Sequence, residues 1–151
     1  MADIQAKVVR RHEEAEGIAS WELERADGGA LPPFSAGSHI DVHVPGGLVR
    51  QYSLCNQAGD TSRYRIAVLR DANSRGGSSA MHDLVKEGDT LTISEPRNHF
   101  PLVPAPHTLL LAGGIGITPL LCMAQRLHAT GASFALHACN RSRSRSAFVD
   151  E

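Results

Sequence analysis

Three side chains with chemistry suited to a flavin lie within the stretch Arg50-Gln51-Tyr52-Ser53. On an extended strand, Arg50 and Tyr52 point to one face and Ser53 to the other. A guanidinium can bind a phosphate through two N–H groups, and an aromatic ring can lie along a flat conjugated ring. The hydroxyl or backbone amide of Ser53 can hydrogen-bond a flavin near N5, where a hydride arrives. An ordinary barrel strand would carry the same residues, so the stretch gains meaning only from its context.

A glycine-rich loop, Asn73 to Ser78, directly precedes a segment predicted to form a short helix. Gly76 and Gly77 let the backbone approach an anion, and the amides of Gly77 and Ser78 point outward at the helix start. Arg75 adds positive charge. We predict that this loop binds a terminal phosphate, as in FMN. A flexible surface loop of the same composition is the alternative.

A second glycine-rich turn, Gly113-Gly114-Ile115-Gly116-Ile117-Thr118-Pro119, follows an apolar run. Its amides can face a pyrophosphate, with Thr118 as the N-cap of the next helix and Pro119 at the first helical position. Pro119 stands where a dinucleotide-binding fingerprint has its third glycine, and Asn140 and Arg141 stand where its acidic residue would be. The turn is therefore not an ordinary Rossmann fingerprint, and a tight connection without a ligand is the alternative.

Alternating arginine and serine occupy the segment Arg141-Ser142-Arg143-Ser144-Arg145-Ser146. Three arginines are too few for a nucleic-acid tract. The segment follows a predicted strand at the carboxyl edge of a sheet, where nucleotides bind in α/β folds. A contact from Arg141 or Arg143 to an adenosine phosphate or ribose and a solvated loop are both compatible with this pattern.

Composition argues against several classes of partner. The chain has 151 residues, a net charge of -1 and a pI of about 6.7, which gives no reason to expect a nucleic-acid partner. No basic-then-apolar leader and no membrane-length apolar run occur, so we expect a cytoplasmic protein without a membrane partner. The cysteines Cys55, Cys122 and Cys139 are isolated and the histidines are scattered, so no metal site is predicted, and we expect the three cysteines to be buried or half-buried.

The first hundred residues have the pattern of an antiparallel barrel. Short segments with alternating polarity, separated by glycine and proline, predict six strands at 6–12, 18–25, 39–44, 48–54, 64–70 and 90–94. One short helix is predicted at 79–85. Together these elements predict a six-stranded antiparallel β-barrel over residues 1–104 that binds the flavin.

The pattern changes after Pro101. Residues 107–112 are a continuous apolar run, as in a parallel sheet covered on both faces. A helix then begins at Thr118 and stops at Gly131, and 133–138 is a second buried strand. We expect residues 105–151 to form the first strand–helix–strand unit of a doubly wound α/β nucleotide-binding domain, incomplete as written.

In combination, these motifs resemble the reductase components of Rieske-type aromatic-ring oxygenases. The resemblance is to the N-terminal portion of the phthalate dioxygenase reductase and vanillate O-demethylase reductase family. The matching segments occur in order: the flavin motif 50–56, the strand lining the ring 66–71, the phosphate loop 75–78, the segment closing the barrel 96–102 and the nicotinamide-side turn 112–119.

The resemblance implies a flavin-dependent oxidoreductase of aromatic catabolism that passes electrons from NADH through FMN to an iron–sulfur centre and a terminal oxygenase. It implies that Ser53 and Thr118 lie nearest the chemistry. The implied binding residues are, for phosphate, Arg50, Arg75, Gly76, Gly77 and Ser78; for the isoalloxazine, Tyr52, Ser53, Ala67 and Val68; and for the nicotinamide nucleotide, Gly113, Gly114, Gly116 and Thr118.

The chain also departs from the family. The ferredoxin-type [2Fe–2S] domain with its four cysteines has no counterpart in these 151 residues, and Ser79 stands where several relatives carry arginine. We therefore expect a fragment that carries the flavin site. FAD in place of FMN, as in ferredoxin reductases, and a non-catalytic module that dimerises through an exposed sheet edge are the alternatives.

Overall fold

The computed structural model describes residues 2–73, 75–149 and 151, and within them the six predicted strands are present. Ser74, in the predicted phosphate loop, lies outside the described residues. The first strand is longer than predicted because it pairs with two neighbours and continues through two register shifts. The elements of this part are β1 (Asp3–Ala15), β2 (Ile18–Arg25), β3 (His39–Val44), β4 (Leu48–Ser53), β5 (Tyr64–Leu69), α1 (Gly77–Leu84) and β6 (Thr90–Ser94).

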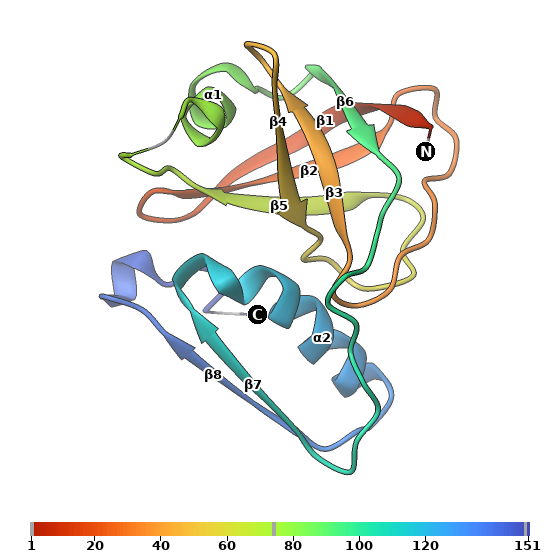
Figure 1. Ribbon diagram of the computed structural model, residues 1–151, viewed down its shortest axis with the longest axis vertical. Helices are drawn as coiled ribbons and strands as arrows, with labels where there is room; N and C mark the ends of the chain where they lie inside the picture. Colours follow the sequence, from red (N-terminus) through yellow and green to blue (C-terminus); the bar gives the residue numbers. More distant parts are fainter. Residues whose placement is uncertain (1, 74, 150) are drawn as a thin grey trace.

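The six strands form one antiparallel sheet in the order β4-β3-β6-β1-β2-β5. The sheet curves so that its two edge strands, β4 and β5, approach each other (Figure 1). Helix α1 lies beside this gap and contacts β3, β4 and β5. An edge strand leaves alternate backbone N–H and C=O groups outside the ladder, so the gap offers hydrogen-bonding groups on both sides.

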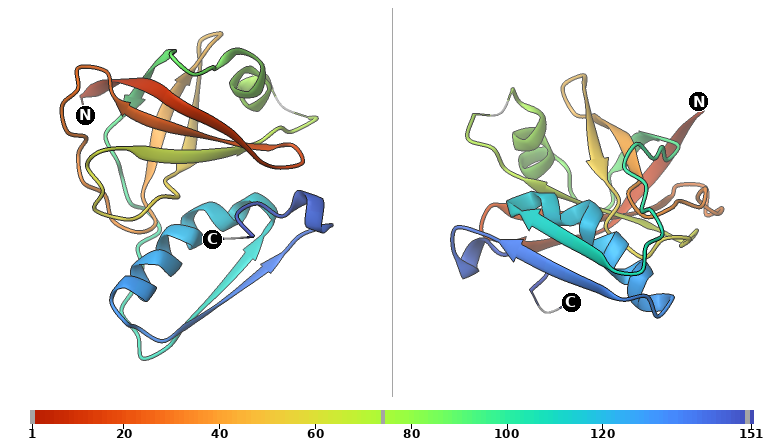
Figure 2. Two further views of the ribbon diagram at one scale, coloured as in Figure 1. Left: turned by 180° about the vertical axis from the view of Figure 1, so that it is seen from behind. Right: turned by 60° about the horizontal axis from the view of Figure 1, so that its bottom comes forward.

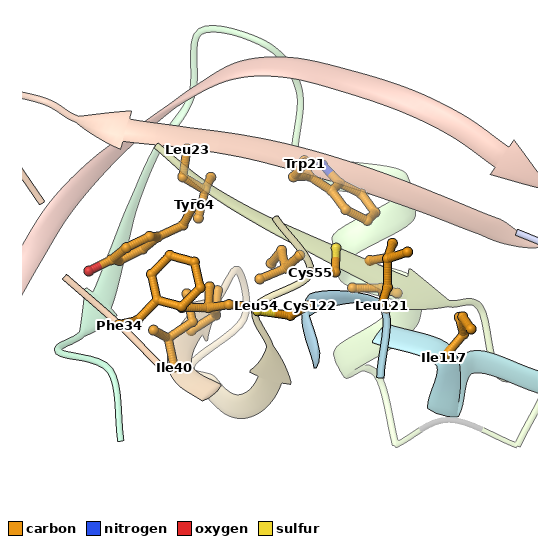
Figure 3. Close-up of a cluster of buried hydrophobic side chains, with 14 of the residues drawn as sticks. Trp21, Leu23, Phe34, Ile40, Leu54, Cys55, Tyr64, Ile117, Leu121 and Cys122 are labelled. Carbon is orange, nitrogen blue, oxygen red and sulfur yellow. The ribbon is translucent and has the colours of Figure 1, made fainter. Parts of the chain in front are cut away.

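The barrel core consists of fully buried aliphatic and aromatic side chains. Trp21, Leu23, Ile40 and Tyr64, which Figure 3 shows packed together, have no exposed surface, and neither has Ile66. The polar atoms of the two aromatic residues are satisfied, since the Trp21 indole N–H donates to the Val85 carbonyl at 3.1 Å and the Tyr64 hydroxyl donates to the Pro32 carbonyl. Burial of the large aromatic rings supplies much of the stabilisation of this unit.

A strand–helix–strand unit follows, as predicted. The unit consists of β7 (Thr108–Gly113), the 3₁₀ turn η1 (Gly114–Gly116), α2 (Ile117–Ala129), β8 (Phe134–Cys139) and the 3₁₀ turn η2 (Arg143–Arg145). Strands β7 and β8 are parallel and in register from Thr108 opposite Phe134 to Gly113 opposite Cys139. Helix α2 lies between this small sheet and the barrel in both views of Figure 2.

Three expectations for this unit are wrong. Thr118 is not the N-cap, because η1 brings the chain into the helix and α2 begins at Ile117 with Gly116 as its N-cap residue. Neither strand is covered on both faces: Leu109 and Leu111 are 56% and 68% exposed, and β8 is half-buried to exposed throughout. Cys139, expected to be at least half-buried, is exposed, whereas the other two cysteines are buried.

The two units share one apolar core. Ile117, Leu121 and Cys122 of α2 belong to the same buried cluster as Leu54 and Cys55, which follow β4 (Figure 3). The contact fixes α2 against the barrel beside the gap between β4 and β5. Among the described residues, no helix is long and apolar enough to cross a lipid bilayer.

Candidate functional site

A pocket of about 850 Å³ occupies the gap between the edge strands β4 and β5. Nine of the residues predicted to bind a cofactor line it: Arg50, Tyr52, Ser53, Ala67, Val68, Arg75, Ser78, Gly116 and Thr118. They come from β4, β5, the loop before α1, the turn before α2 and the first turns of both helices. The size is within the range of small-molecule and cofactor sites.

Positive charge and outward-facing amides meet at one end of this pocket. The Arg50 side chain lies against Gly77, so close that a Cβ added to Gly77 would stand 2.7 Å from Nε and 2.8 Å from Cγ of Arg50. Glycine is needed there because a side chain would displace the arginine. Arg50 Nη1 donates to the Val49 carbonyl at 2.9 Å, which uses one of the five guanidinium N–H donors.

The backbone conformation at the start of α1 also depends on glycine. Gly76 is the N-cap residue and has φ of +106°, a left-handed conformation that other residues rarely adopt. The Ser78 hydroxyl oxygen accepts a hydrogen bond from the Asp71 backbone N–H at 3.1 Å, so its own hydrogen is free to be donated. This end of the pocket can therefore hold an anion through a guanidinium, a hydroxyl and helix-start amides.

The middle of the pocket is flatter and less polar. The register of β3 and β4 pairs Arg50 with Val42 and Tyr52 with Ile40, so Arg50 and Tyr52 share the face that continues the barrel core. Tyr52 is half-buried, and its burial raises the pKa of the phenol, an effect that Arg50 opposes.

The opposite wall is β5. Ala67 and Val68 are buried there and line the pocket. A flat ring between Tyr52 and β5 would have an aromatic face on one side and an edge strand on the other.

The turn before α2 closes the other end. Gly116 and Thr118 line the pocket, and the buried Thr118 hydroxyl donates to the Ile115 carbonyl at 3.3 Å, which orients its lone pairs. The predicted Gly113 and Gly114 lie apart from this pocket, each bordering a neighbouring one.

Six lining residues were missed among the predicted site residues. They are Gln51, Leu69, Asp71, Asn73, Ile115 and Pro119. Leu69 and Asp71 belong to the segment 66–71, which resembles the strand lining the flavin ring in the related reductases. That resemblance could have predicted both residues.

A second pocket of about 750 Å³ adjoins the first and shares Leu69, Asp71, Asn73 and Ile115 with it. It runs along the carboxyl ends of β7 and β8 and is lined by Arg141 but not by Arg143, which separates the two arginines that the sequence left as alternatives.

The Arg/Ser segment is held in place from the barrel. The Glu16 backbone N–H donates to the Ser144 carbonyl at 2.7 Å, and the Ser144 hydroxyl donates to Glu16 Oε2 at 3.1 Å. Arg145 Nη2 lies 3.6 Å from Glu16 Oε1. The turn between β1 and β2 thus fixes one wall of the second pocket.

No protein-family model matches the chain, but individual relatives are close. The vanillate O-demethylase oxidoreductase of Pseudomonas sp. (strain HR199 / DSM 7063) is 58% identical over 137 residues, which is 90% of this chain and 43% of the relative. The phthalate dioxygenase reductase of Burkholderia cepacia is 47% identical over 150 residues, 98% of this chain and 47% of the relative. The chain thus spans less than half the length of these relatives.

A solved structure of phthalate dioxygenase reductase superposes with a TM-score of 0.96 at 46% identity, covering 99% of this chain and 47% of that one. That protein is described as a modular structure for electron transfer from pyridine nucleotides to [2Fe–2S]. The agreement extends through both the barrel and the strand–helix–strand unit, which confirms the fold class. Over almost its whole length, the chain is similar to phthalate dioxygenase reductase and to vanillate O-demethylase oxidoreductases.

Proposed function

We propose that this chain carries the FMN site of an NADH-dependent reductase that supplies electrons to an aromatic-ring oxygenase or demethylase. The observation that carries the proposal is the packing of Arg50 on Gly77 at the phosphate end of the pocket. There a fixed positive charge meets the start of α1, while the rest of the pocket is bounded by an aromatic ring and an edge strand. A flat ring system with a short phosphate-bearing chain matches these features.

The phosphate end favours a terminal phosphate over a bridging one. Arg50, Arg75 and Ser78 line the pocket there, and Asp71 is the acidic residue among the lining residues. The predicted Gly76 and Gly77 are not lining residues, but Gly77 lies against the Arg50 side chain. Guanidinium groups bind a phosphate through parallel N–H groups, and helix-start amides add uncharged donors. FMN ends in a phosphomonoester, which presents its oxygens to such a cradle from several sides.

When bound, FMN would accept two electrons with a hydride from the nicotinamide and release them one at a time. The protein's part is to orient and to exclude water. Tyr52 would cover one face of the ring, and the backbone of Ala67 and Val68 would hydrogen-bond its polar edge. The Ser53 hydroxyl would donate to the ring position at which the hydride arrives.

The nicotinamide would enter from the side of α2. Gly116 and Thr118 border the pocket there, and Gly114 and Arg141 border the adjoining groove. The shared wall of the two pockets would let one dinucleotide place its nicotinamide beside the flavin and its adenosine half at the carboxyl ends of β7 and β8. The electrons would then pass to a [2Fe–2S] centre and a terminal oxygenase.

Flavin binding by the purified chain tests the proposal. We expect FMN to bind with quenched or shifted flavin fluorescence, and Arg50→Ala to weaken FMN roughly 10- to 100-fold because a charge-assisted bond is lost. Riboflavin, which lacks the phosphate, should lose little. Arg10→Ala, which removes an arginine that pairs with Glu22 and does not line the pocket, is the control. Equal losses for FMN and riboflavin would show that Arg50 does not bind the phosphate.

The cofactor released on denaturation distinguishes FMN from FAD by mass. One solved structural relative, a flavohaem-like domain 26% identical to this chain with a TM-score of 0.87, is described as FAD/NAD-binding, so this measurement is needed. Anaerobic addition of NADH or NADPH to the flavin-loaded chain, followed by absorbance of the oxidised flavin, tests hydride transfer. A chain that binds neither flavin would overturn the proposal.

A further inference from the structure

A half-buried histidine joins the phosphate end of the flavin pocket to its ring wall. His82 lies on α1, and its Nε2 is 2.8 Å from the carbonyl oxygen of Val68 on β5. Because a carbonyl can only accept, Nε2 carries the hydrogen. The ring of Trp21 meets the His82 ring edge-on at 5.4 Å and has no exposed surface. The imidazole is thus held between a core aromatic residue and the strand that borders the pocket.

Other side-chain interactions of α1 either lie elsewhere on the helix or are weaker than the hydrogen bond of His82 to Val68. The Trp21 indole N–H bonds the Val85 carbonyl beyond the carboxyl end of α1, far from the phosphate loop. Arg70 and Asp83 form a two-pronged ion pair, but their side chains are 47% and 52% exposed, and such pairs contribute little. The Ser78 hydroxyl accepts from the Asp71 backbone N–H at 3.1 Å, but Asp71 lies beyond the end of β5 and this bond is exposed. His82, in the second half of α1, is a partly buried side chain bonded to a β5 residue that lines the ring wall.

The same helix begins at the phosphate loop. Gly77 is its first residue, and one helical turn separates the loop from His82. A bound flavin spans both places, since its phosphate lies at Gly77 and Ser78 and its ring lies against Val68 in the function proposed above. The distance between α1 and β5 therefore decides whether both ends of one ligand can be bound together.

We propose that His82 is a positioning residue for the flavin site: its hydrogen bond to the Val68 carbonyl fixes the spacing between the phosphate loop and the ring wall. This inference rests on the proposed FMN site and adds a residue outside it, because His82 does not line the pocket. A ligand that uses both ends, such as FMN, depends on this spacing. A ligand that uses only the ring wall, such as riboflavin, does not.

Two amide variants test the spacing directly. In His82→Gln, the side-chain amide reaches as far as Nε2 and can still donate to Val68. In His82→Asn, the amide is one methylene shorter and cannot. We expect His82→Asn to weaken FMN roughly five- to tenfold, the size of one net hydrogen bond, and riboflavin less than about twofold. His82→Gln should restore most of the FMN affinity. Asp83→Asn, on the same helix, should bind both flavins as the wild type does.

The controls separate positioning from folding. Affinities are measured well below each variant's melting temperature, with far-UV circular dichroism to confirm the fold, and His82→Leu serves as a third variant of similar volume. A parallel loss for FMN and riboflavin, or a His82→Gln that behaves like His82→Asn, overturns the inference and leaves the flavin site standing. A wild type that binds neither flavin overturns the proposed function, and this inference with it.

Discussion

The barrel and the strand–helix–strand unit differ sharply in how they bury apolar side chains. In the barrel, residues as large as Trp21 and Tyr64 have no exposed surface, whereas Leu109 and Leu111 on β7 are 56% and 68% exposed. The buried side of the second unit faces the barrel through α2. Within the described residues, the two units share one buried cluster, but the barrel contributes its fully buried aromatic residues and most of the candidate flavin site, and the second unit depends on the barrel for its packing.

Loss of a core aromatic residue should separate the two regions most clearly. Trp21→Ala leaves a cavity and an unpaired Val85 carbonyl, so we expect the free energy of unfolding to fall by about 3–5 kcal/mol. Leu111→Ala, on the exposed face of β7, should change it by less than about 0.5 kcal/mol. Urea unfolding followed by circular dichroism measures both. Similar losses for the two variants would contradict the idea that stability resides in the barrel.

Alanine substitutions at one glycine in each unit compare the two regions by their effect on FMN binding. Gly77→Ala places a methyl group 2.7 Å from Arg50 Nε, so the arginine must move and FMN should bind roughly tenfold more weakly. In Gly113→Ala, the added methyl group meets nothing within 4 Å and the backbone φ is -113°, so binding should be unchanged. Isothermal titration with FMN gives both constants. If Gly113→Ala weakened FMN as much as Gly77→Ala does, the phosphate end would have been misassigned.

The sequence predicted the barrel well because its signals are local. The alternation of Ile40, Val42 and Val44 defines β3 with the bounds that the structure has. The side chains of Arg50 and Tyr52 share a face because a strand has a period of two residues.

The position of the pocket could not be predicted in the same way. It lies between β4 and β5, which are edges of one sheet, and no local pattern reveals which strands lack a second neighbour. The contact of Gly77 with Arg50 likewise joins residues that are far apart in the chain.

Most of the wrong predictions concern the strand–helix–strand unit, where the local sequence patterns are compatible with more than one structure. Thr118 followed by Pro119 has the composition of a helix start, but the glycines of η1 allow a 3₁₀ turn that brings Thr118 inside the helix. The run Leu109-Leu110-Leu111 has the composition of a strand buried on both faces. In the structure α2 covers one face only, and hydrophobicity alone cannot say whether a second cover is present.

The contact between the β1–β2 turn and the Arg/Ser segment offers a smaller test. Glu16→Ala removes the acceptor of the Ser144 hydroxyl and the ion-pair partner of Arg145, so trypsin should cleave after the arginines at 141, 143 and 145 a few-fold faster. The backbone bond from Glu16 to Ser144 remains and limits the effect. Glu13→Ala, which removes an exposed pair with Arg11 on the same hairpin, is the control. Unchanged cleavage in Glu16→Ala would mean that the barrel does not hold this segment.

The smallest effect should come from a titrating group in the barrel. Partial burial lowers the pKa of His39, and the positive charges of Arg97 and His99 lower it further, while Asp41 opposes them. The folded protein therefore takes up the His39 proton less readily than the unfolded chain does. Stability should be fully present above the unfolded value of about 6.5 and should decline as the pH falls below it.

His39→Gln should remove that part of the decline between pH 7.5 and 5.5, measured as the change in urea midpoint. His137→Gln, an exposed histidine on β8, is the matched change in the other region and should leave the profile as in the wild type. If His137→Gln flattened the profile and His39→Gln did not, the second unit rather than the barrel would control the response to acid. The acid dependence of stability would then arise in the strand–helix–strand unit, whereas most of the candidate flavin site lies in the barrel.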